Sequence, residues 1–590
     1  MKYFVIVRSI YKVMNIDYII VIAGGAAIVT FTVLSVMYYL TVVTRPKHKH
    51  DDQIKWSDYL SVFTDSFSRK KFLYLSFIAL LNAGLSTVAF LYSSQQAVFI
   101  TLIILKSKDV IMTTVQVVCV IVAFVKRYIL RRVQTPMVVT PSNIVTIIPV
   151  YSEPKEQIDV TINSSMDNQI GQHRQLICVI CDGLDVNVQD DLTETLHEST
   201  EAYVSWKQEH NELRITYGKI KDTPCVIMKK VKNQGKKDTL IVSHDIFNHP
   251  RTNITKETLK LRETVRQNVK TFYDMDGFEF MFCTDADSLI VKGSFIHLID
   301  TIERRQAVAC CGLVVIDFAE GKWGFWNIFQ NFQYLYGQYI RRGTENIYGK
   351  VSCLPGCITM FKICETASKA IAMYSELPDN HEMLKSIVQM LGTDRRLTAS
   401  FLYQGKNVIT AYDPRAKCYT IPPSTLKSYL SQRRRWGSNA YFNTLCNLVG
   451  PNVHILMRMF CFMDYVRMSI EYVRIFNTIL FVYSLTQGVV VYTIIPFVAV
   501  MAFPTTFFMI RALCSGFLRK MYVKLMIGYF FNKVFSMAIS IMIISNVMYN
   551  IGSAKWGGNQ KETEAVPPQP EQTPDWPIEV VVQSQDTAQR

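Results

Sequence analysis

The sequence has little charge, and its cysteines lack the grouping that a metal site or a disulfide scaffold requires. Only 19% of the 590 residues are charged, whereas 49% are hydrophobic, which is too apolar for a disordered chain. The 14 cysteines are spread along a long chain, so they do not form a small disulfide-rich domain. The pairs Cys178/Cys181 and Cys353/Cys357 have no second pair beside them, which argues against structural zinc.

The hydrophobic residues are concentrated in long runs at both ends of the chain. The first run, Tyr18 to Val43, contains no charged residue and exceeds the roughly 20 residues that cross a bilayer. A cleaved signal peptide is the alternative, but its apolar core would be shorter. The other candidate spans are Phe72–Tyr92, Val110–Leu130, Met459–Leu485, Gly488–Ile510 and Leu525–Tyr549. We therefore expect six spans, within a range of about five to seven.

The run at Met459–Leu485 differs from the others because it contains Asp464, Arg467, Glu471 and Arg474. Charged side chains are costly inside a bilayer unless they face protein or water. This segment is therefore expected to turn its charged face to protein or a water-filled cavity, or to lie along the membrane surface.

Lysine and arginine are enriched in two short segments between the runs, 44–71 and 511–524. Cytoplasmic loops of membrane proteins carry an excess of these residues, so both segments are predicted to face the cytoplasm. With three spans on each side, the polar middle 131–458 is then cytoplasmic and both termini lie outside. Lys2, Arg8 and Lys12 do not fit this orientation. The Pro- and Gln-rich tail 553–590 is predicted to be disordered.

Short runs of β-branched and aromatic residues in the polar middle each end at a polar turn. They are Asn143–Val150, Gln175–Cys181 and Phe278–Cys283. Because helix-length segments separate them, they predict an α/β domain with a mostly parallel sheet. Ligands of such sheets bind beyond the carboxyl ends of the strands. Those ends carry Glu153, Asp182 and the triplet Asp285-Ala286-Asp287.

The triplet is the sharpest of these signals. Two carboxylates that flank one small residue can hold Mg²⁺ or Mn²⁺ together with a diphosphate. An isolated triplet of this kind is more often a solvated turn, but its place directly after an apolar strand favours a metal site.

Two later segments carry residues suited to group transfer. Gly392-Thr393-Asp394-Arg395-Arg396 places one carboxylate beside two guanidinium groups, which fits either a salt-bridged turn or a general base for an acceptor hydroxyl. Ser431–Trp436, with the sequence SQRRRW, offers cations for a diphosphate and an indole on which a sugar can stack. A basic segment that binds anionic lipid is the alternative for the second.

Taken together and in this order, these segments resemble processive family-two glycosyltransferases and, among them, the chitin synthases. The resemblance runs from about Ile148 to Trp436 and continues more loosely into the following spans. The matching segments are ICDG at 180–183, NQGKKD at 233–238, TDADS at 284–288, ENIYGKVSCLPGC at 345–357, GTDRRLT at 392–398 and AKCYTIPPSTLKSYLSQRRRW at 416–436. The CLPGC and QRRRW segments distinguish chitin synthases from cellulose and hyaluronan synthases, which share a sparser pattern.

The resemblance implies a GT-A-like α/β domain that uses UDP-GlcNAc with Mg²⁺ or Mn²⁺ and extends a β-1,4-linked chitin chain by inverting transfer. By position, Asp394 corresponds to the catalytic base, and Asp285 and Asp287 correspond to the metal site. Thr393 departs from the family, which usually has an acidic residue there. The substrate-binding residues implied by the resemblance are Glu153, Asp182, Lys236, Lys237, Asp285, Gln432, Arg435 and Trp436, and the implied gating loop is Pro355, Gly356 and Cys357.

The expected organisation is a catalytic domain inserted between two membrane regions. The predicted boundaries are an N-terminal membrane region at 1–130, a cytoplasmic catalytic domain at 131–437, an interface helix with about three spans at 438–552 that form an export channel, and the tail at 553–590. Within the third region, Tyr441–Val449 is the expected interface helix.

The predicted partners are UDP-GlcNAc, the growing chitin chain and the lipid bilayer, with the plasma membrane as the expected location. No nucleic acid is expected, and a homo-oligomer stays open. A hyaluronan or cellulose synthase of the same architecture is the alternative function, followed by a non-catalytic polysaccharide channel.

Overall fold

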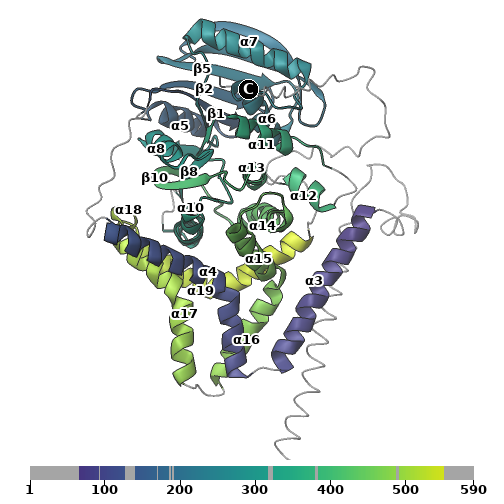
Figure 1. Cartoon of the computed structure of the whole chain (residues 1–590), viewed down its shortest axis with the longest axis vertical. Coiled ribbons are helices and arrows are strands. Elements are labelled where there is room, and N and C mark those ends of the chain that lie inside the picture. Colours follow the sequence, from purple (N-terminus) through teal and green to yellow (C-terminus); the bar gives the residue numbers. More distant parts are fainter. Residues whose placement is uncertain are drawn as a thin grey trace, which may run out of the picture.

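The computed structural model describes residues 66–91, 94–126, 140–168, 170–184, 188, 192–316, 323–378, 383–391, 393–486 and 491–549. Within these residues, a sheet with covering helices lies on one side of a group of long helices (Figure 1). The predicted first span Tyr18–Val43 and the predicted disordered tail lie outside the described residues.

A mixed ten-stranded sheet forms the core of the upper part, in the order β3-β4-β5-β2-β1-β6-β9-β8-β10-β7. Its strands are β1 Asn143–Val150, β2 Arg174–Cys181, β3 Glu194–Val204, β4 His210–Ile220, β5 Thr223–Lys230, β6 Phe280–Cys283, β7 Ser288–Ile290, β8 Ala309–Ile316, β9 Thr359–Lys362 and β10 Thr410–Thr420. The three strands expected from the sequence are β1, β2 and β6. β1 pairs in parallel with both β2 and β6, so their carboxyl ends meet at one edge. The predicted α/β fold class is therefore confirmed.

The expectation of a mostly parallel sheet is wrong, because the sheet mixes both kinds of pairing: β5 pairs in parallel with β2 and β10 with β8, but the other pairs outside the centre are antiparallel. β3, β4 and β5 pair antiparallel, and β9 pairs antiparallel with both β6 and β8. Only the tight turn at Lys221 and Asp222 separates β4 from β5, and so short a connection can join only antiparallel neighbours. The central strands are buried along nearly their whole length, as expected for strands covered on both faces.

Helices cover both faces of the sheet and connect its strands (Figure 1). They are α5 Lys155–Met166, α6 Gly235–Phe247, α7 Lys256–Tyr273, α8 Ser294–Arg305, α9 Phe325–Tyr336, the π-helix η3 Gly337–Arg342, α10 Gly343–Ile347, α11 Glu365–Tyr374, α12 Met383–Leu391 and α13 Asp394–Leu402. α6 is buried from Lys237 to Phe247. Its first turn is therefore held in a fixed place at the edge where β1 and β2 end.

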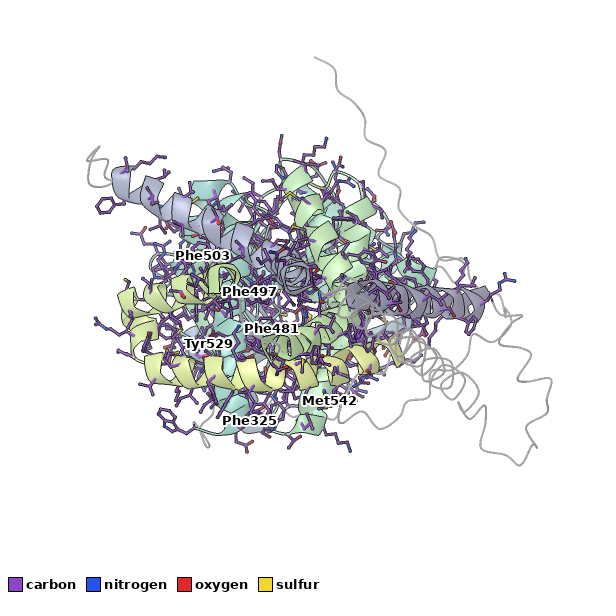
Figure 2. The ribbon with its side chains drawn as sticks, turned by 90° about the horizontal axis from the view of Figure 1, so that it is seen from below. Phe325, Phe481, Phe497, Phe503, Tyr529 and Met542 are labelled. Atoms are coloured by element: carbon purple, nitrogen blue, oxygen red, sulfur yellow. The ribbon has the colours of Figure 1, made fainter. Side chains whose placement is uncertain are left out.

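Four helices within the described residues are long and apolar enough to cross a membrane. They are α3 Ser66–Leu91, α4 Gln95–Phe124, α17 Val491–Cys514 and α19 Tyr522–Tyr549. The spans predicted at Phe72–Tyr92, Gly488–Ile510 and Leu525–Tyr549 coincide with α3, α17 and α19. Seen from below in Figure 2, Phe481 and Phe497 lie near the centre of this group. Both rings pack against Phe99 of α4, at 5.5 and 4.5 Å between ring centroids.

The span predicted at Val110–Leu130 is displaced, because α4 begins at Gln95. The apolar run that predicts this span is interrupted in the middle of α4 by Lys106, Lys108 and Asp109, so the first half of the helix was not included. These charges are paired with protein: Lys106 with Asp109 at 2.7 Å, Asp109 with Arg341 at 3.1 Å, and Lys108 with Asp464.

The single span predicted at Met459–Leu485 is also wrong. The segment forms two helices, α15 Ile455–Ser469 and α16 Glu471–Thr486, because Ile470 leaves helical geometry with φ −107° and ψ 32°. Asp464 pairs with Lys108 of α4, so the charged face of this segment meets protein, as one of the sequence alternatives expected.

The segment from the basic motif to the expected interface helix is one continuous helix, α14 Leu426–Val449. Its first turn is closed by a reciprocal capping box between Thr425 and Ser428, which satisfies amide groups that a helix start leaves open. The domain boundary drawn at 437/438 therefore falls within α14. The short helix α18 Gly516–Arg519 lies between α17 and α19.

Candidate active site

Asp182, at the end of β2, holds the loop that opens α6. Its carboxylate accepts hydrogen bonds from the backbone N–H groups of Gln234 at 2.9 Å and Gly235 at 2.7 Å. Lys230 Nζ lies 3.3 Å from the same carboxylate. Gly235 has φ +83°, a conformation that favours glycine. Asp182 therefore fixes the start of α6, the helix that carries Lys236 and Lys237.

Glu153, after β1, shapes a second loop at the same edge. Its Oε2 accepts hydrogen bonds from the N–H groups of Tyr151 at 2.7 Å and Ser152 at 3.1 Å. Both acids predicted to hold the nucleotide thus lie at the shared strand edge, and each organises a loop there.

The carboxylates of Asp285, Asp287 and Asp394 gather with Lys236 in what we call the carboxylate centre. Lys236 Nζ pairs with Asp285 Oδ1. Asp394, the first residue of α13, accepts a hydrogen bond from the Gly356 N–H at 3.1 Å. The Gly356 backbone reaches the middle of this group. A Cβ atom there would lie 2.8 Å from Lys236 Nζ and 3.1 Å from Asp285 Oδ1, and it would lie 3.4 Å from Asp394 Oδ1.

Burial and charge shift the pKa values within this centre. Burial and the neighbouring Asp285 raise the pKa of Asp287 to about 6, although Lys236 acts in the opposite direction. Burial lowers the pKa of Lys236, but the carboxylates of Asp285 and Asp394 outweigh it and leave that pKa well above its usual value. The centre thus has more negative charge than Lys236 neutralises, which is the condition that attracts a cation.

The predicted gating loop, Pro355 to Cys357, is tied to the strand of the triplet and to the helix of Asp394. Thr284 Oγ1 donates to the Cys357 carbonyl at 3.1 Å, and the Leu354 N–H donates to Thr398 Oγ1 at 3.0 Å. These bonds and the Gly356–Asp394 bond join segments that lie far apart in the sequence.

The basic motif on α14 presents an aromatic cluster with a cation inside it. The Arg433 guanidinium lies 4.7 Å from the Trp436 ring centroid, 4.9 Å from that of Tyr429 and 5.5 Å from that of Tyr334. Trp436 is 42% exposed, and its ring centroid is 5.8 Å from that of Tyr334. An exposed indole braced by a cation and a second ring is suited to stack on a sugar.

Polar atoms of the same motif are buried without a hydrogen-bond partner in the described part of the chain. They include Gln432 Oε1 and the Nε and Nη2 atoms of Arg433. Buried polar atoms normally have partners, so these atoms are suited to a bound substrate. Burial and the adjacent Arg434 lower the pKa of Arg435 on the same helix.

Arg433 was not singled out from the sequence, although a signal for it exists. It precedes Trp436 by three positions, and residues three apart share one face of a helix. Tyr334 of this cluster is contributed by α9. Burial raises the pKa of its hydroxyl, Arg433 lowers it, and Cys357 and, to a smaller extent, Asp287 raise it.

Lys237 is not brought to the carboxylate centre. Its ammonium group donates to the Gln389 carbonyl at 3.1 Å and lies 4.1 Å from the ring centroid of Trp206. Burial and the nearby Arg396 lower the pKa of Lys237 to about 7, while Glu376 raises it. The two adjacent lysines of the NQGKKD segment thus point into different surroundings.

A protein-family model described as chitin synthase matches residues 196–542, which is more than half of the chain. The chain belongs to the chitin synthase family. The match includes every predicted site residue from Lys236 to Trp436, whereas Glu153 and Asp182 precede it.

Curated relatives carry the same family name. Chitin synthase 8 of Verticillium dahliae is 24% identical over 366 residues, which cover 55% of this chain and 60% of that protein. Chitin synthase 8 of Gibberella zeae is 25% identical, with 54% and 51% covered. Chitin synthase 6 of Pyricularia oryzae is 27% identical, with 50% and 18% covered. The chain thus aligns with less than two thirds of each of these relatives.

Among solved structures, a mannosyltransferase, PcManGT from Pyrobaculum calidifontis in complex with GDP-Man and Mn²⁺, superposes with a TM-score of 0.39. The sequences are 11% identical, and the superposition covers 78% of this chain and 99% of that chain.

The donor set of this chitin synthase family member fits a divalent cation that is shared with a substrate. Asp285 and Asp287 supply hard carboxylate oxygens of the kind that Mg²⁺ and Mn²⁺ prefer. Within the described residues, no group of three or more His, Cys, Asp or Glu side chains could hold a metal by itself. Two carboxylates with a diphosphate and water are the usual arrangement for Mg²⁺, so the metal would bind together with the donor.

We expect Gly356→Ala to lower the turnover number by about 10- to 100-fold, because a displacement of about 1 Å in an active site can have an effect of that size. The added methyl group displaces Lys236 and Asp285 from their present contact. Both are flexible side-chain ends, so the thermal midpoint should change little. Turnover and thermal unfolding of the variant measure the two effects.

Gly405→Ala is the matched control, because a Cβ atom at Gly405 meets only Val408 at an ordinary 3.6 Å. An active Gly356→Ala variant would show that the loop need not approach the carboxylates closely.

Proposed function

We propose that the protein is a chitin synthase that transfers GlcNAc from UDP-GlcNAc to the 4-hydroxyl of a growing β-1,4-linked chain. The observation that supports this best is the meeting of Lys236, Asp285 and Asp394 around the backbone of Gly356 in a chain that belongs to the chitin synthase family. The start of α6, the Asp285-Ala286-Asp287 triplet and the start of α13, which the proposed chemistry requires, thereby meet at one place.

The donor would bind at the shared strand edge. The loops organised by Glu153 and Asp182 would receive the uridine, and Asp285 and Asp287 would hold Mg²⁺ or Mn²⁺ beside the diphosphate. Such a cation neutralises charge on the leaving diphosphate. Lys236, which here neutralises Asp285, is close enough to the start of α6 to contribute to diphosphate binding as well.

The acceptor would approach from α14. Trp436, braced by Arg433, would stack on the terminal sugar, while Gln432 and Arg435 would bind polar groups of the sugar and the diphosphate. Asp394 would accept the proton of the acceptor's 4-hydroxyl while the hydroxyl oxygen attacks the anomeric carbon of the donor sugar. UDP would leave from the opposite face of that carbon. This single displacement inverts the anomeric centre without a covalent sugar–enzyme intermediate. Pro355 to Cys357 would form the gate beside the reacting groups.

The product would leave through the membrane. Four apolar helices of the described chain are suited to a bilayer, and α14 continues from the acceptor motif toward them. We infer that the catalytic domain is cytoplasmic, that the bilayer is the plasma membrane, and that synthesis and export occur in the same chain.

The test is incorporation of radiolabelled UDP-GlcNAc by the purified full chain with Mg²⁺ or Mn²⁺, followed by chitinase digestion of the insoluble product. We expect a polymer that forms from this single donor and is digested by chitinase. A polymer that requires UDP-glucuronate would instead indicate a hyaluronan synthase. Absence of turnover with every UDP-sugar would contradict enzymatic function and favour a non-catalytic channel.

A further inference from the structure

Lys237 is a buried cation that is held by a helix end and two aromatic rings. Lys237 is only 7% exposed. The ammonium donates to the Gln389 carbonyl at 3.1 Å and lies 4.1 Å from the Trp206 ring centroid and 5.0 Å from that of Tyr374. Within the described residues, no carboxylate forms an ion pair with it. The carbonyl is therefore its one direct hydrogen-bond acceptor there.

The Gln389 carbonyl belongs to the last turn of α12, where carbonyl groups lack helical partners and favour a cation. The chain then passes into α13, whose first residue is Asp394. A contact that fixes the end of α12 therefore also limits where Asp394 can lie.

The first turn of α6, from which Lys237 reaches α12, is held in place by buried contacts. The neighbouring Asp238 is fully buried and pairs with Lys230 at 2.8 Å. It also accepts hydrogen bonds from the Tyr203 hydroxyl at 2.9 Å and the backbone N–H of Trp206 at 2.8 Å. The indole N–H of Trp206 donates to the Gln234 carbonyl at 3.3 Å, so the ring is anchored to the start of α6 and the position of Lys237 is set by the sheet.

We propose that Lys237 is a positioning residue that links the first turn of α6 to the end of α12 and so sets the place of Asp394 relative to Lys236 and Asp285. The two adjacent lysines then have separate roles: Lys236 contacts Asp285 of the triplet, and Lys237 holds the end of α12, which precedes Asp394. The inference rests on the proposed function insofar as Asp394 acts as the base.

The test compares Lys237→Met, Lys237→Arg and the control Lys260→Met in the full chain, reconstituted in lipid nanodiscs. Methionine keeps the apolar stem that packs against the rings but removes the hydrogen bond. Arginine can donate to the same carbonyl and stack on the same rings. Lys260 is an exposed residue of α7.

We expect Lys237→Met to lower the turnover number by about 10- to 100-fold and to leave the KM for UDP-GlcNAc and the affinity for UDP within about two-fold. Lys237→Arg should recover most of the turnover, and Lys260→Met should match the unmodified protein. Hydrogen exchange of residues 383–398 should be faster in Lys237→Met alone, because the end of α12 is no longer held.

A raised KM and weakened UDP binding with unchanged turnover would overturn the proposal and assign Lys237 to the diphosphate. Equal losses in the methionine and arginine variants, with lowered thermal midpoints, would also overturn it and indicate a packing role. If the unmodified protein forms no polymer, the proposed function fails, but the hydrogen-exchange comparison still decides whether Lys237 holds α12.

Discussion

Replacing Asp394 with asparagine is expected to lower the rate of the proposed sugar transfer by about 10²- to 10⁴-fold, the usual contribution of a general base, while UDP still binds. Asparagine keeps an oxygen that can accept the Gly356 N–H now bonded at 3.1 Å, so the loop and α13 should stay in place. It cannot accept the proton of the acceptor hydroxyl. Polymer formation and UDP affinity, measured on the same preparation, separate these effects.

Asp222→Asn is the matched control for this variant. Asp222 is exposed in the turn between β4 and β5, away from the carboxylate centre, and the substitution makes the same chemical change. Full activity of the Asp394 variant would remove this residue as the base. Loss of UDP binding together with activity would indicate that Asp394 supports the donor site.

Replacing Asp287 with alanine is expected to weaken metal-dependent UDP binding by about 100-fold or more. Mutation of a residue that only orients a metal ligand already lowers metal affinity by about 10- to 100-fold. Burial and Asp285 raise the pKa of Asp287 to about 6, and a metal must displace the proton of a protonated ligand. Mn²⁺ affinity in the unmodified protein should therefore fall as the pH drops through about 6. Titration calorimetry with Mn²⁺ and UDP at several pH values measures both effects.

The alanine variant should lose that pH dependence along with its affinity. It should not lose stability, because burial already disfavours the ionised carboxylate. Asp222→Ala serves as the control. Unchanged Mn²⁺ affinity in the Asp287 variant would assign the metal to other oxygens, whereas a fall in affinity without any change in its pH dependence would mean that another group titrates near pH 6.

Much of the centre of the fold follows from local sequence pattern. β1, β2 and β6 are apolar runs that end at polar turns, and a parallel sheet brings such ends to one edge. Glu153, Asp182 and Asp285 could therefore be placed near one another without a structure. The apolar helices α3, α17 and α19 were likewise evident, because a long apolar run with at most one charged residue is a strong signal.

Other features depended on partners far along the chain. The start of α4 was misplaced because Lys106, Lys108 and Asp109 suggest a polar segment, yet Arg341 and Asp464 pair with these charges. The local sequence carries no comparably clear signal for the helix break at Ile470. The same holds for β9, which lies antiparallel between β6 and β8.

The sequence by itself determined which residue types are available for the chemistry and on which elements they lie. It did not determine where each long side chain points. Lys236 and Lys237 are adjacent and chemically identical, but only Lys236 meets Asp285, while Lys237 meets the end of α12. The tertiary structure decided this difference, because successive helix positions face different directions and the partner that each one meets comes from a distant part of the chain.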